Sequence, residues 1–428
     1  MKFRTFSMMM ILLLIAGVGV SACAPAPKPT ELLLGALVCR TGELSSSGES
    51  SEAALEIAVK DVNEYLSSIG GKASVRLIVE DTETDPAVAL EKLKGLAQKG
   101  VRVVIGPQSS AEVEAVKAYA DKNGILLVSQ SSTTSSLAIP GDNVFRFCPD
   151  DTHQAEATAR LMWEDGMKAI VPLWRDDVWG ISLSTATKRS FEELGGNVLD
   201  GIRYGPTTDD FSALLESLNL EVSQAIAQYG ADAVGVHLMA FEEVVSLFVQ
   251  AGQEQNAILS TVKWYGSDGT AQNNALVSNA QAARFAVRTG FPNPIYRGKT
   301  EVERYGLIEA QIQEKIGRPP TAYDVAAYDA LWVATQAYLA TGETDDIEAL
   351  KKAVLHTAGS YIGATGRTSL NEAGDRQFQD YGFWAVRENN DDEAFQWVCV
   401  ARYRRGASEG RLTYETKPFQ PDDVFSNP

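Results

Sequence analysis

Residues 103–113, VVIGPQSSAEV, show how this chain is built. They begin as a short apolar run typical of a buried β-strand and end as the start of an amphipathic helix, with Gly106 and the hydroxyls of Ser109 and Ser110 at the junction. Short apolar strands that alternate with amphipathic helices indicate a parallel sheet covered on both faces. The function of the protein therefore depends on what kind of ligand the polar groups at this junction bind.

The same alternation recurs along most of the chain. A first series of strands and helices runs over residues 31–130, and a second begins after NVFRFCPDD at 143–151 and continues to about Gly266. Two successive doubly wound α/β units are the simplest interpretation. Beyond Pro292 the pattern changes to long helices, then to two strand-like segments, and after Arg411 to a polar tail.

The N-terminus predicts export. A short positive start precedes an apolar run at residues 8–20, which is too short for a membrane-spanning helix. The sequence VSAC at 20–23 resembles a bacterial lipobox, in which Cys23 is acylated; an ordinary secretory cleavage site is the alternative. We therefore expect a signal peptide at 1–22, a proline-rich tether at 23–30, and a two-chain lipid anchor on the outer face of the cell membrane.

The composition excludes several classes of function. A formal net charge of −18 argues against binding nucleic acid and against an electrostatic grip on anionic lipid. Three cysteines remain beyond Cys23, so at most one disulfide forms and at least one thiol is free; whether Cys39 or Cys148 pairs with Cys399 is left open. These cysteines and the three histidines fit no zinc spacing, so we expect no metal site. The length suits two lobes, and we expect a monomer.

Polar residues follow the strands of the first unit. They are Gly106 to Ser110 at one strand end and SQSSTT at 129–134 at another. In open α/β sheets, ligands lie beyond the carboxyl ends of the strands, where hydroxyls and free N–H groups at helix starts favour an anion such as a carboxylate. The alternative for each single Ser or Thr is that it only caps a helix.

The strand ends of the second unit offer different chemistry. They carry DDVWG at 176–180, HLM at 237–239 and GSDG at 266–269. An aromatic ring near a carboxylate suits a cation, although Trp179 alone is explained by packing and Asp268 alone by a turn. Together the two units are complementary to a zwitterion.

Catalytic signatures are missing from the sequence. There is no G-x-S-x-G elbow, no phosphate-binding P-loop and no G-x-G-x-x-G after the first strand. We therefore expect no catalytic residue, no cofactor and no enzymatic activity. The junction at 106–110 is predicted to hold an anion and not to attack one.

The ordered set of motifs resembles the leucine/isoleucine/valine-binding group of ABC-importer substrate-binding proteins. It comprises VIGPQSS, NGILLVSQSSTT, VFRFCPDD, DDVWG, YGSDG and AAYDAL, and the resemblance extends from about Leu32 to Trp397. It implies a type I periplasmic binding protein fold, in which two Rossmann-like lobes are joined by a three-stranded hinge. The implied lobes are 31–146 with 292–378 and 147–291 with 379–411, followed by a tail at 412–428.

The resemblance also implies ligand contacts. The family's carboxylate-binding positions match Ser110, Thr133 and the backbone of Ser131, and its ammonium-binding acid matches Asp268. An aromatic residue before a glycine in the second lobe matches Trp179.

Further positions depart from the family or add to it. Asp268 is one methylene shorter than the usual Glu, Met239 stands where a tyrosine is common, and Ser47 stands where an aromatic often closes the pocket. We include Met239, Gln108 and Ser109 among the expected ligand contacts.

The predicted function is an extracytoplasmic, lipid-anchored receptor that captures a small zwitterion, an amino acid of the branched-chain type or another, and delivers it to an ABC permease. The alternatives left open are an amide, urea or aromatic acid as the ligand, a sensory ligand-binding subunit, and an exported hydrolase.

Overall fold

The computed structural model describes residues 30–297, 303–342, 346–377, 380–389, 394–405 and 410–415. The signal peptide, Cys23 and almost all of the tether expected before residue 31 lie outside these residues, as does the tail after residue 415.

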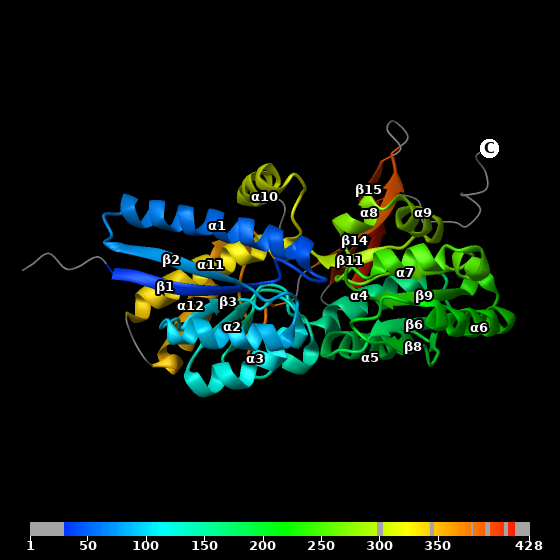
Figure 1. Cartoon of the computed structure of the whole chain (residues 1–428), viewed down its shortest axis with the longest axis horizontal. Helices are drawn as coiled ribbons and strands as arrows, with labels where there is room; N and C mark the ends of the chain where they lie inside the picture. Colours follow the sequence, from blue (N-terminus) through cyan, green and yellow to red (C-terminus); the bar gives the residue numbers. More distant parts are fainter. Residues whose placement is uncertain are drawn as a thin grey trace, which may run out of the picture.

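The first half of the molecule is a parallel sheet of five strands with helices on both faces (Figure 1). Ala36 packs with helices α1 and α11 on one face, whereas its neighbour Leu37 packs with α2 and α3 on the other. The strands, in the spatial order β2-β1-β3-β4-β5, are β1 (Thr30–Val38), β2 (Ala73–Asp81), β3 (Val103–Ile105), β4 (Leu126–Ser129) and β5 (Val144–Arg146). The helices are α1 (Ser45–Ser68), α2 (Pro86–Gln98), α3 (Ser110–Asn123), the 3-10 turn η1 (Ser135–Leu137), α10 (Glu303–Ile316), α11 (Ala322–Thr341) and α12 (Ile347–Ser360).

The second half repeats this plan beside the first (Figure 1). Ile170 faces α4 and α5, and Val171 faces α6 and α7 on the opposite side of the sheet. The strands are β6 (Ala169–Arg175), β7 (Asn197–Val198), β8 (Ile202–Tyr204), β9 (Val234–Met239) and β10 (Lys263–Tyr265). The helices are α4 (Asp151–Glu164), α5 (Val178–Glu193), α6 (Ser212–Tyr229), η2 (Ala231–Ala233), α7 (Val244–Ala251), η3 (Glu254–Ser260), α8 (Asn274–Ser278) and α9 (Ala280–Thr289). The expected α/β fold with two doubly wound parallel sheets is confirmed.

A third, antiparallel sheet forms from the later part of the chain. Its order is β11-β14-β15-β16, and a short hairpin, β12-β13, stands apart from it. The strands are β11 (Asn293–Tyr296), β12 (Ile362–Gly363), β13 (Gly366–Arg367), β14 (Tyr381–Glu388), β15 (Phe395–Arg405) and β16 (Gly410–Tyr414).

We propose the lobe boundaries expected from the sequence, with two adjustments. Because β11 pairs with β14, a boundary at residue 292 would divide one strand pair between two lobes, and a boundary after Tyr296 keeps the pair together. Strand β16 reaches Tyr414 and pairs with β15, so regular structure continues beyond the boundary expected at Arg411.

Gly106 allows the chain to turn sharply between β3 and α3. Its φ of +97° is in the left-handed region, and a Cβ there would lie 2.2 Å from the carbonyl oxygen of Leu37. Only glycine adopts this conformation against neighbouring backbone without strain. Helix α3 therefore begins directly at the edge of the sheet.

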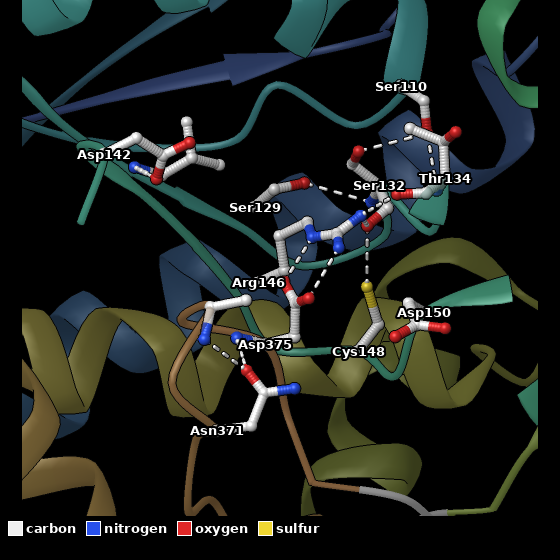
Figure 2. Close-up of polar contacts among 12 residues, drawn as sticks. Ser110, Ser129, Ser132, Thr134, Asp142, Arg146, Cys148, Asp150, Asn371 and Asp375 are labelled. Carbon is white, nitrogen blue, oxygen red and sulfur yellow. Dashed lines mark hydrogen bonds and ion pairs between the residues drawn. The ribbon is translucent and has the colours of Figure 1, made fainter. Parts of the chain in front are cut away.

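A buried ion pair joins β5 to a distant segment of the chain (Figure 2). The guanidinium of Arg146 contacts the carboxylate of Asp375 through Nε–Oδ1 at 2.5 Å and Nη2–Oδ2 at 2.7 Å, and each side chain is 1% exposed. Nη1 of Arg146 also donates to the carbonyl oxygens of Ser132 and Thr134 at 3.2 and 2.5 Å. Burial lowers the pKa of Arg146, but Asp375 outweighs it and raises that pKa, so the guanidinium is charged.

We expect Asp375→Asn to lower the free energy of unfolding by about 3–5 kcal/mol, because it leaves a buried guanidinium without its counter-charge. Urea denaturation at pH 7 measures this loss. The control is Lys188→Gln, which removes an exposed pair with Glu192 and should cost less than about 1 kcal/mol. Equal effects of the two substitutions would contradict the role given to Asp375.

Candidate ligand-binding site

A cavity of about 90 Å³ lies between the two halves, and residues from both contribute to its lining. Of the eight expected ligand contacts, all but Met239 line it: Gln108, Ser109, Ser110, Ser131, Thr133, Trp179 and Asp268. The structure thus brings the two half-sites together in one place. Their role as ligand contacts remains a prediction.

Met239 is the expected contact that does not reach the cavity. It is fully buried in a cluster with Trp179, Leu183 and Phe241, because the last residue of β9 still faces the layer between the sheet and α5. Phe241 lines the cavity in its place and stacks on Trp179, with ring centroids 4.7 Å apart at 23°. Only its position just after β9 signalled Phe241 in the sequence.

Ser110 has a hydroxyl hydrogen to offer. Its Oγ accepts hydrogen bonds from the hydroxyl of Ser132 at 3.1 Å and from the N–H of Thr134 at 3.2 Å (Figure 2). A hydroxyl has two acceptor positions and one donor, so Ser110 is left as a donor. It is also the first residue of α3, where the helix dipole favours an anion.

The neighbouring serine has a different role. The hydroxyl of Ser109 donates to Glu112 Oε2 at 2.7 Å and accepts from the N–H of Glu112 at 3.2 Å. These two bonds form a capping box for α3. The hydroxyl of Ser109 therefore caps the helix, which was the alternative to a ligand contact.

Ser131 and Thr133 lie on the loop after β4. The hydroxyl of Ser131 donates to the carbonyl oxygen of Gln108 at 3.0 Å, so a ligand contact there would use the backbone, as the family resemblance implies. The carbonyl oxygen of Thr133 accepts from the N–H of Asp151 at 2.8 Å, which holds this loop against the start of α4.

Asp268 is the acid of the opposite wall. Tyr323 donates its hydroxyl to Oδ2 at 2.7 Å, and Gln154 accepts from the N–H of Asp268 at 2.9 Å. Oδ1 is buried and has no hydrogen-bond partner among the described residues. A buried carboxylate oxygen without a donor is costly, so this wall is prepared for a cationic donor.

Burial raises the pKa of Asp268, against the lowering effect of the hydrogen bond from Tyr323. Burial also raises the pKa of Asp151, and the nearby charge of Asp268 adds to that effect. Gln154 bridges the two acids, since its Nε2 donates to Asp151 Oδ1 at 3.0 Å. Ionisation of both acids at once is therefore unfavourable, because they are buried and lie close together.

Direct contacts join the rims of the cavity. Glu43 pairs with Arg175 at 2.7 Å, and the N–H of Ser46 donates to Glu242 Oε1 at 3.0 Å. The N–H of Glu242 in turn donates to the carbonyl oxygen of Glu43 at 3.2 Å. Each contact joins the first half to the second, so the structure represents a closed cleft.

Several lining residues were missed from the sequence. Helix α1 begins at Ser45, several residues before the apolar stripe of 51–66 that predicted it. The serine-rich stretch SSSGESS at 45–51 was the available signal. Glu43 lies just before this stretch, and further missed residues lie far along the chain, at Glu242, Arg318, Tyr323 and Asp324.

The three cysteines described are free thiols, Cys39 and Cys148 being buried and Cys399 partly so. This agrees with at most one disulfide, and neither of the pairings left open for Cys399 is formed. In the described part of the chain, no group of His, Cys, Asp and Glu side chains is arranged to hold a metal ion. Nor does any described helix combine the length and apolar character needed to cross a membrane.

The sequence profile of a family described as "Periplasmic binding protein" matches residues 31–391. The chain belongs to this family.

Similarity to individual relatives narrows the group within this family. This periplasmic binding protein is 30% identical to an uncharacterized protein of Methanocaldococcus jannaschii over 83% of this chain and 87% of that one. It is 25% identical to Leu/Ile/Val-binding protein homolog 3 of Brucella melitensis, over 81% and 88% of the two chains. These similarities assign it to the branched-chain amino acid group of type I periplasmic binding proteins.

Solved structures share its fold. The leucine-binding protein LivK of Thermotoga maritima aligns with a TM-score of 0.68 at 20% identity, covering 86% of this chain and 98% of that one. A solute-binding protein of an ABC transporter from R. palustris, in complex with benzoate, also aligns with a TM-score of 0.68, at 18% identity and 86% and 96% coverage. Ligands within this fold thus include both an amino acid and an aromatic acid.

We expect Asp268→Asn to raise the free energy of unfolding of the ligand-free binding protein at pH 7. The raised pKa means that the folded state holds the proton more tightly, so this contribution to stability is complete below the unfolded pKa of about 3.9. It is lost as the pH rises through the folded pKa. Asparagine removes the buried charge and retains an acceptor for Tyr323, and the expected gain is roughly 1 kcal/mol.

Urea unfolding of variant and wild type at several pH values between 4 and 7 tests this, and the difference should shrink toward pH 4. Asp232→Asn, at an exposed site, is the control and should show no such trend. A less stable Asp268→Asn protein at pH 7 would contradict the account of this carboxylate.

Proposed function

We propose that this protein is the extracytoplasmic solute receptor of an ABC importer and that its ligand is a small zwitterion, namely an amino acid. One observation carries the proposal. Ser110, whose hydroxyl is left as a donor at the start of α3, lines the same cavity as Asp268, of which one carboxylate oxygen has no hydrogen-bond partner among the described residues. An α-carboxylate and an α-ammonium satisfy these two groups together.

Closure of the cleft strengthens both contacts. Hinged lobes that close around a ligand exclude water, and a charge-assisted hydrogen bond then contributes about 1.5–3 kcal/mol. The pairs between Glu43 and Arg175 and between Ser46 and Glu242 join the two halves and stabilise the closed form. Ligand contacts and contacts between the halves thus both favour the closed form.

Delivery requires a membrane partner. We propose that the closed receptor docks on an ABC permease and that acylated Cys23, through the tether of residues 23–30, keeps it at the membrane surface. A sensory subunit would bind the same ligand, so measurement of amino-acid uptake in a deletion strain separates the two roles: uptake is lost only for a transport receptor.

An aromatic acid or a neutral amide fits the site less well. Benzoate is an anion, and the buried carboxylate of Asp268 would repel it. Urea and simple amides carry no positive charge, so Asp268 would remain ionised without a counter-ion. Trp179 and Phe241 stack on each other and so are not separated by a slot for a third ring.

We expect isothermal titration calorimetry of the mature protein with a panel of L-amino acids, benzoate and urea to show binding of an amino acid. Asp268→Ala should abolish this binding, because it removes the partner of the ammonium group, and the exposed control Asp232→Ala should retain it. Binding of benzoate or urea with no response to any amino acid would overturn the proposed ligand.

Ser110→Ala should weaken amino-acid binding by about 10- to 100-fold, since it removes one donor to the carboxylate. The corresponding amine without a carboxylate is the control ligand, and its weaker binding should be the same in variant and wild type. A loss that is equal for the amino acid and the amine would contradict the assignment of Ser110 to the carboxylate.

A further inference from the structure

We propose that the wall formed by the starts of α1 and α11 selects an amino acid with a neutral, hydrogen-bond-donating side chain, a hydroxyl or a carboxamide, over a branched apolar one. This inference rests on the proposed function and names the class of its ligand.

The wall is built from polar residues of three separate segments. Ser46, Ser47 and Ser50 come from α1, Gln108 from the β3–α3 junction, and Asp324 from the first turn of α11. Leu44 is the only branched aliphatic residue among the cavity's lining residues in the described chain. The other apolar contacts come from rings and small residues, Trp179, Phe241, Tyr323, Pro319 and Ala271, so a branched apolar side chain would find few aliphatic partners.

The orientation of the Gln108 side-chain amide is determined by the backbone N–H of Cys39. Its Oε1 accepts from the N–H of Cys39 at 2.8 Å, so its Nε2 must point the other way and donates to Ser47 at 3.2 Å and to Ser51 at 3.3 Å. Both amide hydrogens are thus used inside the protein, and Gln108 has none for a ligand.

The donors of Ser47 and Ser51 are used as well. Their hydroxyls donate to Asp324 Oδ1 at 2.8 and 3.2 Å. The other carboxylate oxygen of Asp324 accepts from the N–H of Thr321 at 2.7 Å and from its hydroxyl at 2.9 Å. Ser47 therefore gives its hydrogen to Asp324 and one lone pair to Gln108, and its second lone pair remains for a donor from the ligand.

Ser50 repeats this arrangement. Its hydroxyl donates to the carbonyl oxygen of Ser46 at 3.0 Å and accepts from Arg318 Nη1 at 3.1 Å, so it too retains an acceptor position. Gln108, Ser47 and Ser50 have thus used their amide and hydroxyl hydrogens inside the protein, and the two serines present lone pairs.

Arg318 decides between a neutral donor and a cation. Its guanidinium lines the same cavity, contacts Ser46 and Ser50, and pairs with Glu49 at 2.7 Å. A lysine or arginine group that donated to Ser50 would lie beside this guanidinium, whose Nη1 is 3.1 Å from the same oxygen, although Glu49 and Asp324 balance part of its charge. A hydroxyl or carboxamide supplies the donor without the repulsion.

The difference between the ligand classes should be large enough to measure. A site that offers hydrogen bonds to a substrate rejects an analogue that lacks the matching group, because the site's buried polar groups are then left unpaired. Threonine and valine, and asparagine and leucine, are nearly equal in shape within each pair and differ in this group. We expect the polar member of at least one pair to bind about tenfold more tightly or better.

Calorimetric titration of the mature protein with these four amino acids and with lysine and arginine tests the inference, and needs no variant. Ser47→Ala then removes the acceptor, and the ratio of affinities within the pair should fall toward one. Ser182→Ala is the control, because Ser182 contacts Ser135 at 2.9 Å and is not among the residues that line the cavity; it should leave the ratio unchanged.

Each result decides a different claim. If valine binds as tightly as threonine and leucine as tightly as asparagine, the inference is overturned and the proposed amino-acid receptor stays intact. Preference for lysine or arginine overturns the neutrality of the side chain. A ratio that is the same in Ser47→Ala as in wild type overturns the role of Ser47. Failure of every amino acid to bind overturns the proposed function itself.

Discussion

The buried ion pair between Arg146 and Asp375 organises the carboxylate side of the cavity. Arg146 also donates to the carbonyl oxygens of Ser132 and Thr134, and these two residues in turn donate to the hydroxyl oxygen of Ser110. A charge with no contact to the cavity thus determines which way the Ser110 hydrogen points. The donor is prepared before the ligand arrives, which reduces the ordering cost of binding.

The opposite wall is prepared in a different manner, by leaving a group unsatisfied. Tyr323 and Gln154 hold Asp268 in place, but one carboxylate oxygen has no donor in the described chain. The free protein tolerates this cost, and a cationic ligand removes it. Stability of the free protein and affinity for the ligand are therefore opposed at this residue, as is common at sites built for binding.

Closure connects the two walls. Glu43, Ser46 and Arg175 belong to contacts between the halves, and Glu43 and Ser46 also line the cavity. Residues that shape the pocket thus also hold it shut, so a ligand that disturbs the start of α1 would weaken the closed form. The serine-rich start of α1 thus has a structural role in closure beside the recognition role that we propose for it.

The sequence alone determined the alternation of strands and helices, the two parallel sheets and the set of strand ends that carry Ser110 and Asp268, because hydrophobic periodicity and strand-end position are local properties. It did not reveal that Met239 is buried under Trp179, that Ser109 is a cap while Ser110 is a free donor, or that Tyr323 and Asp324 join the site. Those facts depend on contacts between residues up to 277 positions apart, such as Ser47 and Asp324. Only the tertiary structure assigns each hydroxyl hydrogen to a partner, and the groups left over decide what the cavity can bind.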